Sequence, residues 1–165
     1  MARRPRSELP DGIYHVTSRG SNRGAIFIDD TDRKTFLTML GKVVVEHEWA
    51  CHAFCLMTNH YHLIVETTRE LLSRGMHSLN GGYARRFNLR HDRDGHLFRN
   101  RYGVYVIDSE RHLHKACSYI LENPVRAGLC ADASAWKWSG CPLWERAGAE
   151  TATRTGTGTR PGASP

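Results

Sequence analysis

The sequence predicts a single α+β domain built on an antiparallel sheet, and three observations lead to this prediction. The chain has 165 residues, a length that suits one domain of about 100–200 residues. Hydrophobic residues make up 40% of it, which is enough for one core. Segments with strand character alternate with segments of helical spacing between residues 11 and 146, which we expect to form the domain.

The first half of the chain predicts a strand, a helix and a hairpin. Residues 12–18 (GIYHVTS) are rich in the β-branched and aromatic residues that strands favour. The acids at 29–32 are typical of a helix start, and apolar residues then recur at helical spacing over 36–47. Residues 49–57 and 60–66 predict the two strands of a hairpin closed by a tight turn.

The second half predicts a helix, a strand and a final helix. The helical pattern over 72–87 is interrupted by Gly81-Gly82, and residues 102–107 predict a strand. The helix over 110–122 is expected to end at Asn123-Pro124, because a residue before proline avoids helical angles. The order β-α-β-β-α-β predicts a ferredoxin-like (split β-α-β) sheet with helices on one face, plus a C-terminal helix and an irregular tryptophan-containing segment.

Both ends of the chain predict segments outside the fold. Residues 1–10 hold arginines between prolines and predict a flexible basic arm, and residues 147–165 predict a disordered low-complexity tail. No apolar run approaches the ~18 residues of a membrane span, and the first residues lack the apolar stretch of a signal peptide. The odd number of cysteines, five, fits a reducing compartment. We therefore expect a cytoplasmic protein with no membrane partner.

A net charge of +6 predicts a polyanionic partner, most simply nucleic acid. Much of the excess lies between residues 85 and 101, where six arginines are interleaved with aromatic residues and only two acids. Arginines neutralise phosphates, and aromatic rings stack on unpaired bases. The predicted DNA-contacting residues are Arg19, Arg23, Arg85, Arg86, Arg90, Arg93, Arg99 and Arg101.

The segment 59–65 (NHYHLIV) carries the clearest chemical pattern. Side chains alternate between the faces of a strand, so His60 and His62 are expected to point the same way and to be able to share one metal ion. A chance pair among ten histidines is the alternative interpretation. Tyr83 falls in register with an apolar stripe, and taken alone it is better explained as a core residue.

Five segments in this order resemble the HUH-type single-tyrosine transposases, most closely the REP-associated tyrosine transposases. They are GIYHVTSRG, LMTNHYHLIVE, YARRFN with GHLFRNRY, YILENPVRAGL and WKWSG, and they run from about residue 12 to residue 138. The resemblance implies a metal-dependent enzyme that cleaves and rejoins single-stranded DNA at hairpin, or repeat-element, ends. It does so through a 5′-phosphotyrosine intermediate and without a nucleotide cofactor, and the protein would be nucleoid-associated when bound to DNA.

The resemblance also implies roles for particular residues. His60 and His62 match the paired metal ligands, and Tyr83 is placed as the catalytic nucleophile. The family uses a further polar ligand about one helical turn after its tyrosine; position 87 is Phe, so Asn88 is the nearest candidate, although it lies off the Tyr83 face of a regular helix. The metal implied is Mg²⁺ or Mn²⁺. The other tyrosines, Tyr119 among them, are interpreted as structural.

Two further functions remain open at this point. A domesticated, non-catalytic protein that binds DNA hairpins would explain the missing polar residue at position 87. A zinc-stabilised nucleic-acid-binding module would use Cys51, His52 and Cys55 with the histidine pair; Cys51 and Cys55 are expected on one strand face, and buried thiols without a metal are the simpler interpretation. The residues do not distinguish a monomer from a homodimer.

Overall fold

The predicted order of elements is present in the computed structural model, which describes residues 6–141. The sheet consists of β1 (Gly12–Arg19), β2 (Ala50–Leu56), β3 (His60–Thr67), β4 (Gly103–Ile107) and β5 (Ser139–Gly140). The helices are α1 (Asp30–Glu46), α2 (Arg69–Arg90) and α3 (Glu110–Arg126), with short 3₁₀ turns at Arg6–Glu8, Ser21–Arg23 and Ala133–Ala135. This order confirms the α+β, ferredoxin-like plan.

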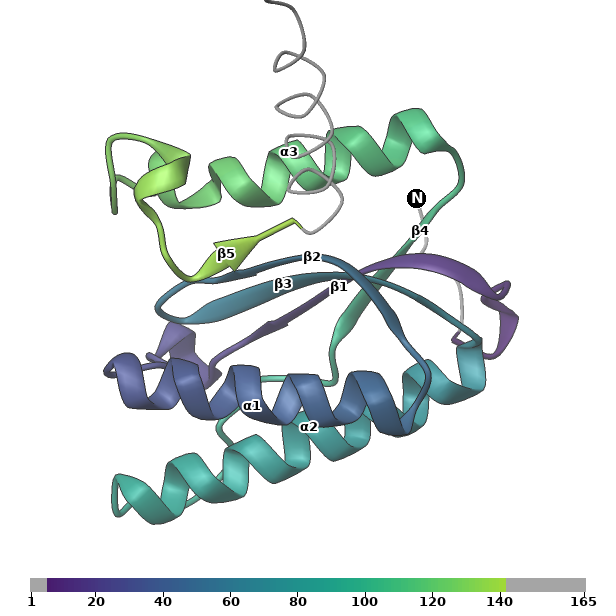
Figure 1. Cartoon of the computed structure of the whole chain (residues 1–165). Helices are drawn as coiled ribbons and strands as arrows, with labels where there is room; N and C mark the ends of the chain where they lie inside the picture. Colours follow the sequence, from purple (N-terminus) through teal and green to yellow (C-terminus); the bar gives the residue numbers. More distant parts are fainter. Residues whose placement is uncertain (1–5, 142–165) are drawn as a thin grey trace, which may run out of the picture.

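One antiparallel sheet separates two helical layers. The strand order is β4-β1-β3-β2-β5, with β1 and β3 paired over their whole length from Gly12↔Thr67 to Arg19↔His60. Helices α1 and α2 lie together below the sheet in Figure 1, and α3 lies above it. We call these two sides the α1/α2 face and the α3 face. The predicted helices on one face and the additional C-terminal helix are both confirmed.

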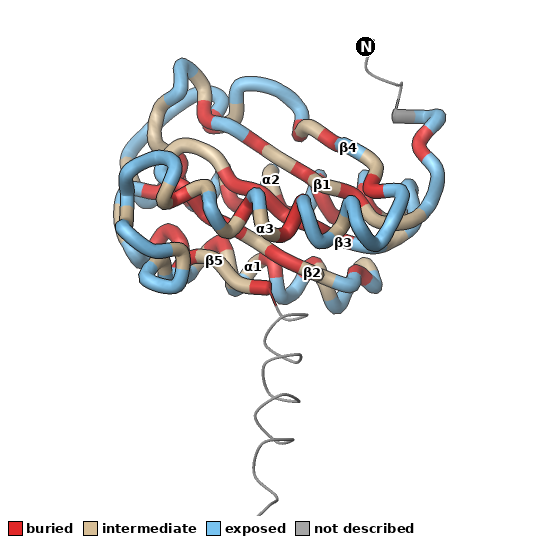
Figure 2. The backbone as a smooth tube through the Cα atoms, turned by 90° about the horizontal axis from the view of Figure 1, so that it is seen from above, coloured by how far each residue is buried: buried red, intermediate tan, exposed pale blue. Residues whose placement is uncertain are grey.

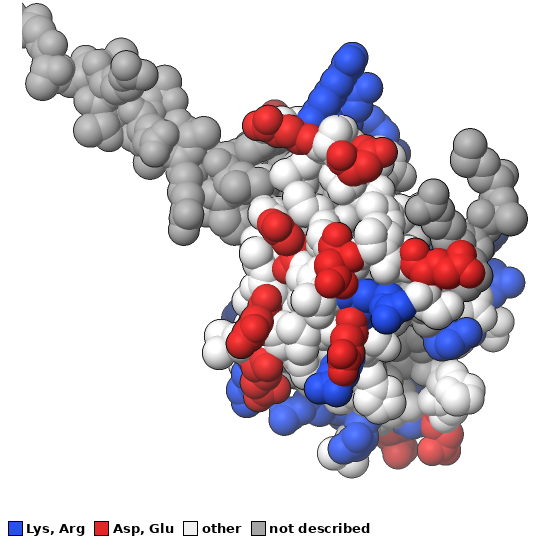
Figure 3. Space-filling view, turned by 90° about the vertical axis from the view of Figure 1, so that its right-hand side faces the viewer, with Lys and Arg blue, Asp and Glu red and all other residues white. Residues whose placement is uncertain are grey.

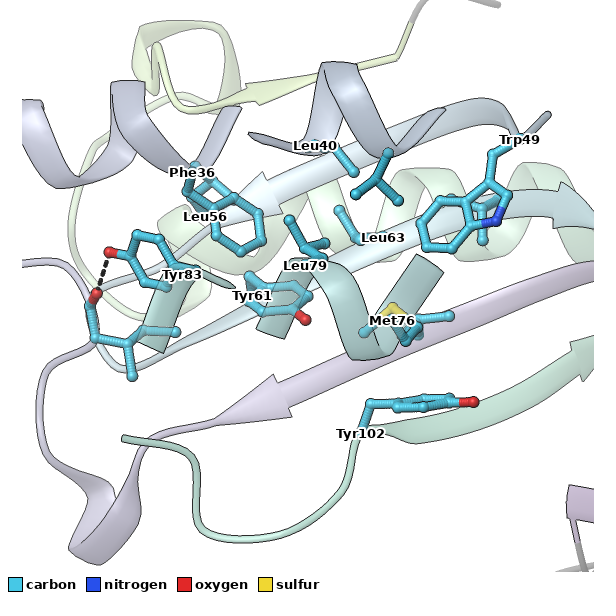
Figure 4. Close-up of a cluster of buried hydrophobic side chains, with 14 of the residues drawn as sticks. Phe36, Leu40, Trp49, Leu56, Tyr61, Leu63, Met76, Leu79, Tyr83 and Tyr102 are labelled. Carbon is cyan, nitrogen blue, oxygen red and sulfur yellow. Dashed lines mark hydrogen bonds between the residues drawn. The ribbon is translucent and has the colours of Figure 1, made fainter. Parts of the chain in front are cut away.

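The main core fills the space between the sheet and the α1/α2 pair. Tyr61 and Leu63 of β3 point into it and meet Phe36 of α1 and Tyr83 of α2 (Figure 4). The ring centroids of Phe36 and Tyr61 are 4.7 Å apart, and those of Phe36 and Tyr83 are 5.1 Å apart, within the range of favourable aromatic pairs. This face of the sheet is therefore dry and closely packed.

A smaller cluster covers part of the α3 face. Ile64 of β3 and Ala53 of β2 pack there against Cys117 and Ile120 of α3. Figure 2 looks down onto this face and shows α3 crossing above the sheet, with buried positions beneath it and exposed positions along its outer side. The helix covers only part of the sheet, so other side chains of this face stay accessible.

Both glycines at the predicted interruption lie inside one continuous helix. Helix α2 runs from Arg69 to Arg90 without a break. A Cβ at Gly82 would lie 2.6 Å from the Met39 side chain of α1, so this glycine allows the two helices to approach closely. At Gly75, a Cβ would lie 2.3 Å from the Trp49 side chain, so this glycine lets the Trp49 ring pack directly against α2. Close packing at these positions compensates for the low helix propensity of glycine.

Helix α3 also extends beyond its predicted end. It continues through Pro124 to Arg126. Pro124 has no amide to donate, so one helical hydrogen bond is missing there, but the turn after it still forms. That turn is closed by hydrogen bonds from the Ala127 and Gly128 amides to Asn123 and Val125. The hairpin turn at Thr58-Asn59 lies where the sequence predicts it, with the Met57 amide bonded to the His60 carbonyl at 2.9 Å.

The segment predicted as a flexible arm is packed where it is described. Leu9 belongs to the main core, the Ser7 carbonyl accepts a hydrogen bond from Arg69, and the Pro10 carbonyl accepts one from Tyr14. Residues 1–5 of the predicted arm, Trp144 and the predicted tail at 147–165 lie outside the described residues. Within residues 6–141, no helix is long and apolar enough to cross a membrane.

The two ends of the sheet differ in charge. At the Gly12–Thr67 end, Asp11, Glu48 and Glu66 line one shallow depression, and Figure 3 views this end and shows acidic side chains spread across it, interspersed with basic ones. At the opposite end, Arg19 pairs with His60, and the backbone of Arg99 bonds to that of Arg19. The acidic lining of the depression disfavours a polyanion, whereas Arg19 and Arg99 at the other end favour one.

Candidate functional site

His60 and His62 lie on the α3 face, as the strand alternation predicts. Their ring centroids are 5.1 Å apart, whereas Tyr61 between them points into the main core. His62 is 8% exposed, and His60 is half-buried at the start of β3. The structure therefore places two neighbouring imidazoles at the part of the sheet that α3 does not fully cover.

Hydrogen bonds occupy the same nitrogen of both imidazoles. His60 Nδ1 lies 2.7 Å from the side-chain oxygen of Asn59, whose amide nitrogen donates to the Arg23 carbonyl at 3.0 Å. Because an amide oxygen only accepts, His60 Nδ1 is the donor and Nε2 carries a free lone pair. His62 Nδ1 lies 2.9 Å from His15 Nε2, which leaves the Nε2 of His62 for another partner.

The surroundings keep this histidine cluster neutral. Burial, followed by the charge of Arg19, lowers the pKa of His60 to about 4. Burial, followed by the neighbouring His15, lowers the pKa of His62 to about 3. Burial also lowers the pKa of His15. At pH 7 the imidazoles are therefore neutral, with one ring nitrogen free to bind a metal ion.

Tyr119 of α3 stands over the histidines. Its ring centroid is 6.2 Å from that of His62 and 6.4 Å from that of His15. The side chain is 44% exposed, so a substrate can reach it. The guanidinium of Arg126 lies 5.1 Å from the same ring, over its face. The sequence alone favours a structural role for Tyr119. In the structure, however, Tyr119 is the one tyrosine among the described residues that both contacts His62 and is exposed to solvent.

Asn123 lies one helical turn after Tyr119. Residues four apart in a helix share a face, so the two side chains are neighbours. The Nδ2 atom of Asn123 is buried and makes no hydrogen bond within the described residues. An amide buried without a partner costs about 1–3 kcal/mol, so a partner that satisfies this group would be favoured. Asn123 is therefore a polar group available for a ligand beside Tyr119.

The structure does not bring Tyr83 to the histidine pair. Tyr83 is on α2, below the opposite face of the sheet, and is 1% exposed. Its hydroxyl donates to the Ile26 carbonyl at 2.5 Å (Figure 4), and burial raises its pKa. The apolar stripe to which Tyr83 belongs thus packs it into the core, which is the interpretation that its register alone favours.

Asn88 likewise lies away from the histidines. It is on α2, and its amide nitrogen donates to the Gly95 carbonyl at 2.8 Å. This bond fixes the segment that follows the helix. The predicted set of Tyr83, Asn88 and the histidine pair is therefore divided between the two faces of the sheet.

The cysteines do not complete a zinc site. A register shift between Cys51 and Ala53 turns the chain, so Cys51 packs against the main core while Cys55 lies on the α3 face. The two thiols do not share a face as the sequence predicts. Burial raises the pKa of Cys51 to about 11 and that of Cys55 to about 12, so both are protonated. Among residues 6–141, no three His, Cys, Asp or Glu are placed to hold one metal ion.

The eight predicted DNA-contacting arginines are all exposed, but they differ in their surroundings. Arg19 is close enough to the histidines to lower their pKa. Arg90 is held by Asp29 and Asp32, at 2.6 Å from each. Arg93 stacks over Phe87, at 5.5 Å from its ring. The remaining ones are Arg23 at the end of the 3₁₀ turn Ser21–Arg23, Arg85 and Arg86 on α2, and Arg99 and Arg101 before β4.

The structure places three further residues at this candidate site that the sequence did not assign to it, namely Tyr119, Asn123 and His15. The separation of Tyr119 and Asn123 along the sequence could have indicated these two residues. Tyr119 and Asn123 are four residues apart, as a polar ligand one turn after a tyrosine requires, whereas Tyr83 and Asn88 are five apart. His15 alternates with the apolar residues at 14 and 16, which predicts that it faces the other side of the sheet.

Comparisons with known proteins agree with this architecture. Residues 9–123 match the family described as IS200-like transposase. A structure described as a REP-associated tyrosine transposase bound to a REP hairpin superposes with a TM-score of 0.69, covering 84% of this chain and 82% of that one at 18% identity, which shows a shared fold. A putative transposase from Deinococcus radiodurans R1 is 20% identical, with a TM-score of 0.49, and covers 74% of this chain and 97% of that one. No curated protein sequence matches. Since the family match spans more than half of its length, the chain belongs to the IS200-like transposase family.

Proposed function

We propose that this transposase cleaves and rejoins single-stranded DNA at hairpin ends, with Tyr119 rather than Tyr83 as its nucleophile and a divalent metal ion at His60 and His62. The observation that carries the proposal is the exposed Tyr119 ring standing 6.2 Å from that of His62. A phenol in this position can reach a phosphate held at the histidines. A phenol in the core, hydrogen-bonded as Tyr83 is, cannot.

The residues present fit a metal ion. Both imidazoles are neutral, and Nε2 of each makes no hydrogen bond among the described residues; donation from His62 Nδ1 to His15 leaves His62 Nε2 its lone pair. Asn123, one turn after Tyr119, would contribute its side-chain oxygen, and its buried, unpaired Nδ2 is a donor for a phosphate oxygen. Two imidazoles and one amide leave room for water and for a phosphate oxygen. Bound there, Mg²⁺ or Mn²⁺ would act as a Lewis acid on the phosphate that Tyr119 attacks.

In the proposed reaction, the Tyr119 hydroxyl displaces the 3′ oxygen from one phosphorus atom of the DNA in a single step. The Tyr119 oxygen bonds to the phosphorus, and the bond from phosphorus to the 3′ oxygen breaks. The phenol proton is lost, and a proton is gained by the departing 3′ oxygen. This leaves a 5′-phosphotyrosine and a free 3′-hydroxyl. Attack by a 3′-hydroxyl on the phosphotyrosine reverses the step and rejoins DNA, so no nucleotide cofactor is required.

Arg19 and Arg126 are placed to hold the DNA backbone at this site. Arg19 is the residue of β1 opposite His60, and Arg126, which pairs with Glu122 at 2.7 Å through one nitrogen, lies over the Tyr119 ring. Guanidinium groups pair with phosphates in a fixed geometry, so these two can position the strand on either side of the tyrosine. The opposite end of the sheet, viewed in Figure 3, carries acidic side chains among basic ones, and Asp11, Glu48 and Glu66 line a depression there.

The alternative function, a non-catalytic protein that binds DNA hairpins, is not needed to explain this arrangement. It depends on the lack of a polar residue at position 87, one turn after Tyr83. With Tyr119 as the nucleophile, the corresponding residue is Asn123, which is polar. The active interpretation therefore accounts for more of the site.

The test is to trap the covalent adduct. The purified chain is incubated with a pool of hairpin-bearing single strands and Mg²⁺ or Mn²⁺, and the adduct is mapped by mass spectrometry. We expect phosphotyrosine at Tyr119, no adduct in Tyr119→Phe, and an adduct in Tyr83→Phe, which serves as the matched control. An adduct that persists in Tyr119→Phe but disappears in Tyr83→Phe would overturn the assignment.

A further inference from the structure

A groove of about 620 Å³ lies away from the histidines, between α2 and the segment 95–102 that precedes β4. Gly81 and Ala84 form part of its α2 wall, and Phe98, Arg99 and Arg101 part of the other wall. Its volume is within the range of about 300–1,000 Å³ that is typical of ligand sites. It belongs to the α1/α2 side of the sheet, so it is not an extension of the tyrosine site.

Three hydrogen bonds fix the segment 95–102 that forms one wall of the groove. The Ser21 amide donates to the Leu97 carbonyl at 2.9 Å, and the Arg99 amide donates to the Arg19 carbonyl at 3.0 Å. At the other end, the Asn88 side chain donates to the Gly95 carbonyl at 2.8 Å. These bonds pin the wall at both ends, so the groove exists before any ligand arrives.

Small residues on the helix keep the groove empty. A Cβ at Gly81 would meet no atom within 4 Å. An ordinary helical side chain at this position would project into open space at the groove. The glycine costs helix stability of up to about 1 kcal/mol, and close packing explains Gly75 and Gly82 but not this one.

The lining combines an apolar floor with a basic rim. Met76, Leu97 and Phe98 supply apolar and aromatic surface, and Arg99 and Arg101 supply charge. Among the residues that the structure describes, no Asp or Glu lines the groove. An aromatic ring beside guanidinium groups is the combination that binds single-stranded nucleic acid, where bases stack and phosphates pair with cations.

We infer that this groove binds a short run of unpaired nucleotides of the DNA strand that the tyrosine site cleaves. The two sites are connected at one end of the sheet, because Arg99 bonds to Arg19 through the backbone and Arg19 is paired with His60 in the sheet register. A strand that leaves the histidines past Arg19 therefore reaches Arg99 next. The inference rests on the proposed function for the identity of the strand.

The test measures binding without catalysis. Fluorescence anisotropy with EDTA present compares a random-sequence single-stranded 12-mer pool with a 12-base-pair duplex pool. We expect Gly81→Trp, which fills the groove, to weaken single-strand binding about five-fold or more and to leave duplex binding within about two-fold. Gly41→Trp is the matched control, because Gly41 also faces open space on an exposed helical surface outside the groove.

Charge provides an independent measurement. Replacing Arg99 and Arg101 by Ala should reduce the salt slope of single-strand binding by about 1.4, at about 0.7 for each phosphate that is no longer neutralised. Lys42→Ala on α1 is the control, and it should change the salt slope by less than half of that amount. This double variant leaves α2 intact, so it carries the test if thermal unfolding shows that Gly81→Trp is not folded.

Three results would overturn the inference. They are an unchanged single-strand affinity in Gly81→Trp, an equal loss of single-strand and duplex binding in that variant, and an unchanged salt slope in the double arginine variant. Because no metal or cleavage enters the measurement, a failure to find the Tyr119 adduct would refute the proposed function without affecting this result. Conversely, a filled groove that leaves affinity unchanged would not count against Tyr119.

Discussion

The two faces of the sheet use the same kinds of residue for different purposes. On the α1/α2 face, Tyr61 and Tyr83 are fully buried, and their hydroxyls bond to an Asn80 oxygen and a backbone carbonyl. On the α3 face, Tyr119 is exposed beside His15 and His62. On the first face both tyrosine hydroxyls are bonded internally, whereas the other face leaves the Nε2 atoms of the histidine pair and the Asn123 amide nitrogen without a partner among the described residues.

This difference separates stability from chemistry. Strand alternation alone produces it, because β3 sends Tyr61 and Leu63 to one side and His60 and His62 to the other. The α1/α2 face, with its larger core, can then contribute most of the hydrophobic stabilisation, while the side chains for which we propose a catalytic role occupy a part of the α3 face that the helix leaves uncovered. Changes to the two faces should therefore have distinct effects.

The largest expected effect is a loss of cleavage on the α3 face. His62→Ala removes one imidazole from the proposed metal site, and losing several kcal/mol of transition-state stabilisation lowers the rate on the order of a thousand-fold. Single-turnover cleavage of a labelled hairpin strand measures this. His52→Ala, a histidine of β2 that pairs with Glu66 instead, is the control and should cleave normally. Normal cleavage by His62→Ala would mean that the pair is not the metal site.

The opposite pattern is expected in the core. Phe36→Ala removes a ring that contacts Phe27, Tyr61 and Tyr83, and it should cost about 3–5 kcal/mol of unfolding free energy. Urea denaturation measures this loss. Tyr119→Phe, which removes an exposed hydroxyl, should stay within about 0.5 kcal/mol of the parent chain. Equal losses in the two variants would contradict the separation of stability from chemistry.

Local rules in the sequence were sufficient to predict the order of elements and the orientation of the histidines. The alternation of β3 requires only the period of a strand, and the Thr58-Asn59 turn requires only its position between two apolar runs. These features depend on neighbours within a few residues. The family and the α+β fold follow from them together with the motifs.

Which tyrosine lies beside the histidine pair depends on tertiary structure. Tyr83 and Tyr119 both lie in apolar helices, and no local rule says which helix covers which face of the sheet. Cys51 shows the same limitation, since one register shift reverses the face that counting along the strand predicts. The four-residue spacing of Tyr119 and Asn123 is the local signal in the sequence for the site that we propose.

An intermediate effect is expected for the residues that orient the histidines. Asn59→Ala removes the acceptor that fixes the proton on His60 Nδ1, and loss of such a supporting hydrogen bond lowers metal affinity about 10–100-fold. Calorimetric titration with Mn²⁺ in the absence of DNA measures it. Asn88→Ala is the matched control, and unchanged Mn²⁺ affinity in it would exclude Asn88 as a ligand. Unchanged affinity in Asn59→Ala would show that the tautomer is set by another group.

The smallest effect concerns the charged contact between the start of α1 and the end of α2. Arg90 bonds to Asp29 and Asp32, and His91 lies 2.9 Å from Asp32. The hydrogen bond from Arg90 lowers the pKa of Asp29 to about 2. Burial raises the pKa of Asp32, but hydrogen bonds from His91, the Ile28 amide and Arg90 outweigh this and leave it below its ordinary value. This contact ties together the two helices that cover the core.

Both carboxylates have a lower pKa folded than unfolded, so their contribution to stability is present above pH 4 and is lost as the pH falls toward 2. Asp29→Asn isolates the charge, since asparagine also caps a helix start, and its Tm should fall less steeply than that of the parent between pH 4 and 2. Thermal unfolding across this range measures the difference. Asp94→Asn, on the exposed segment after α2, should follow the parent curve. If Asp29→Asn does so as well, the contact adds no charge-dependent stability, and the α1/α2 layer is held by its apolar core alone.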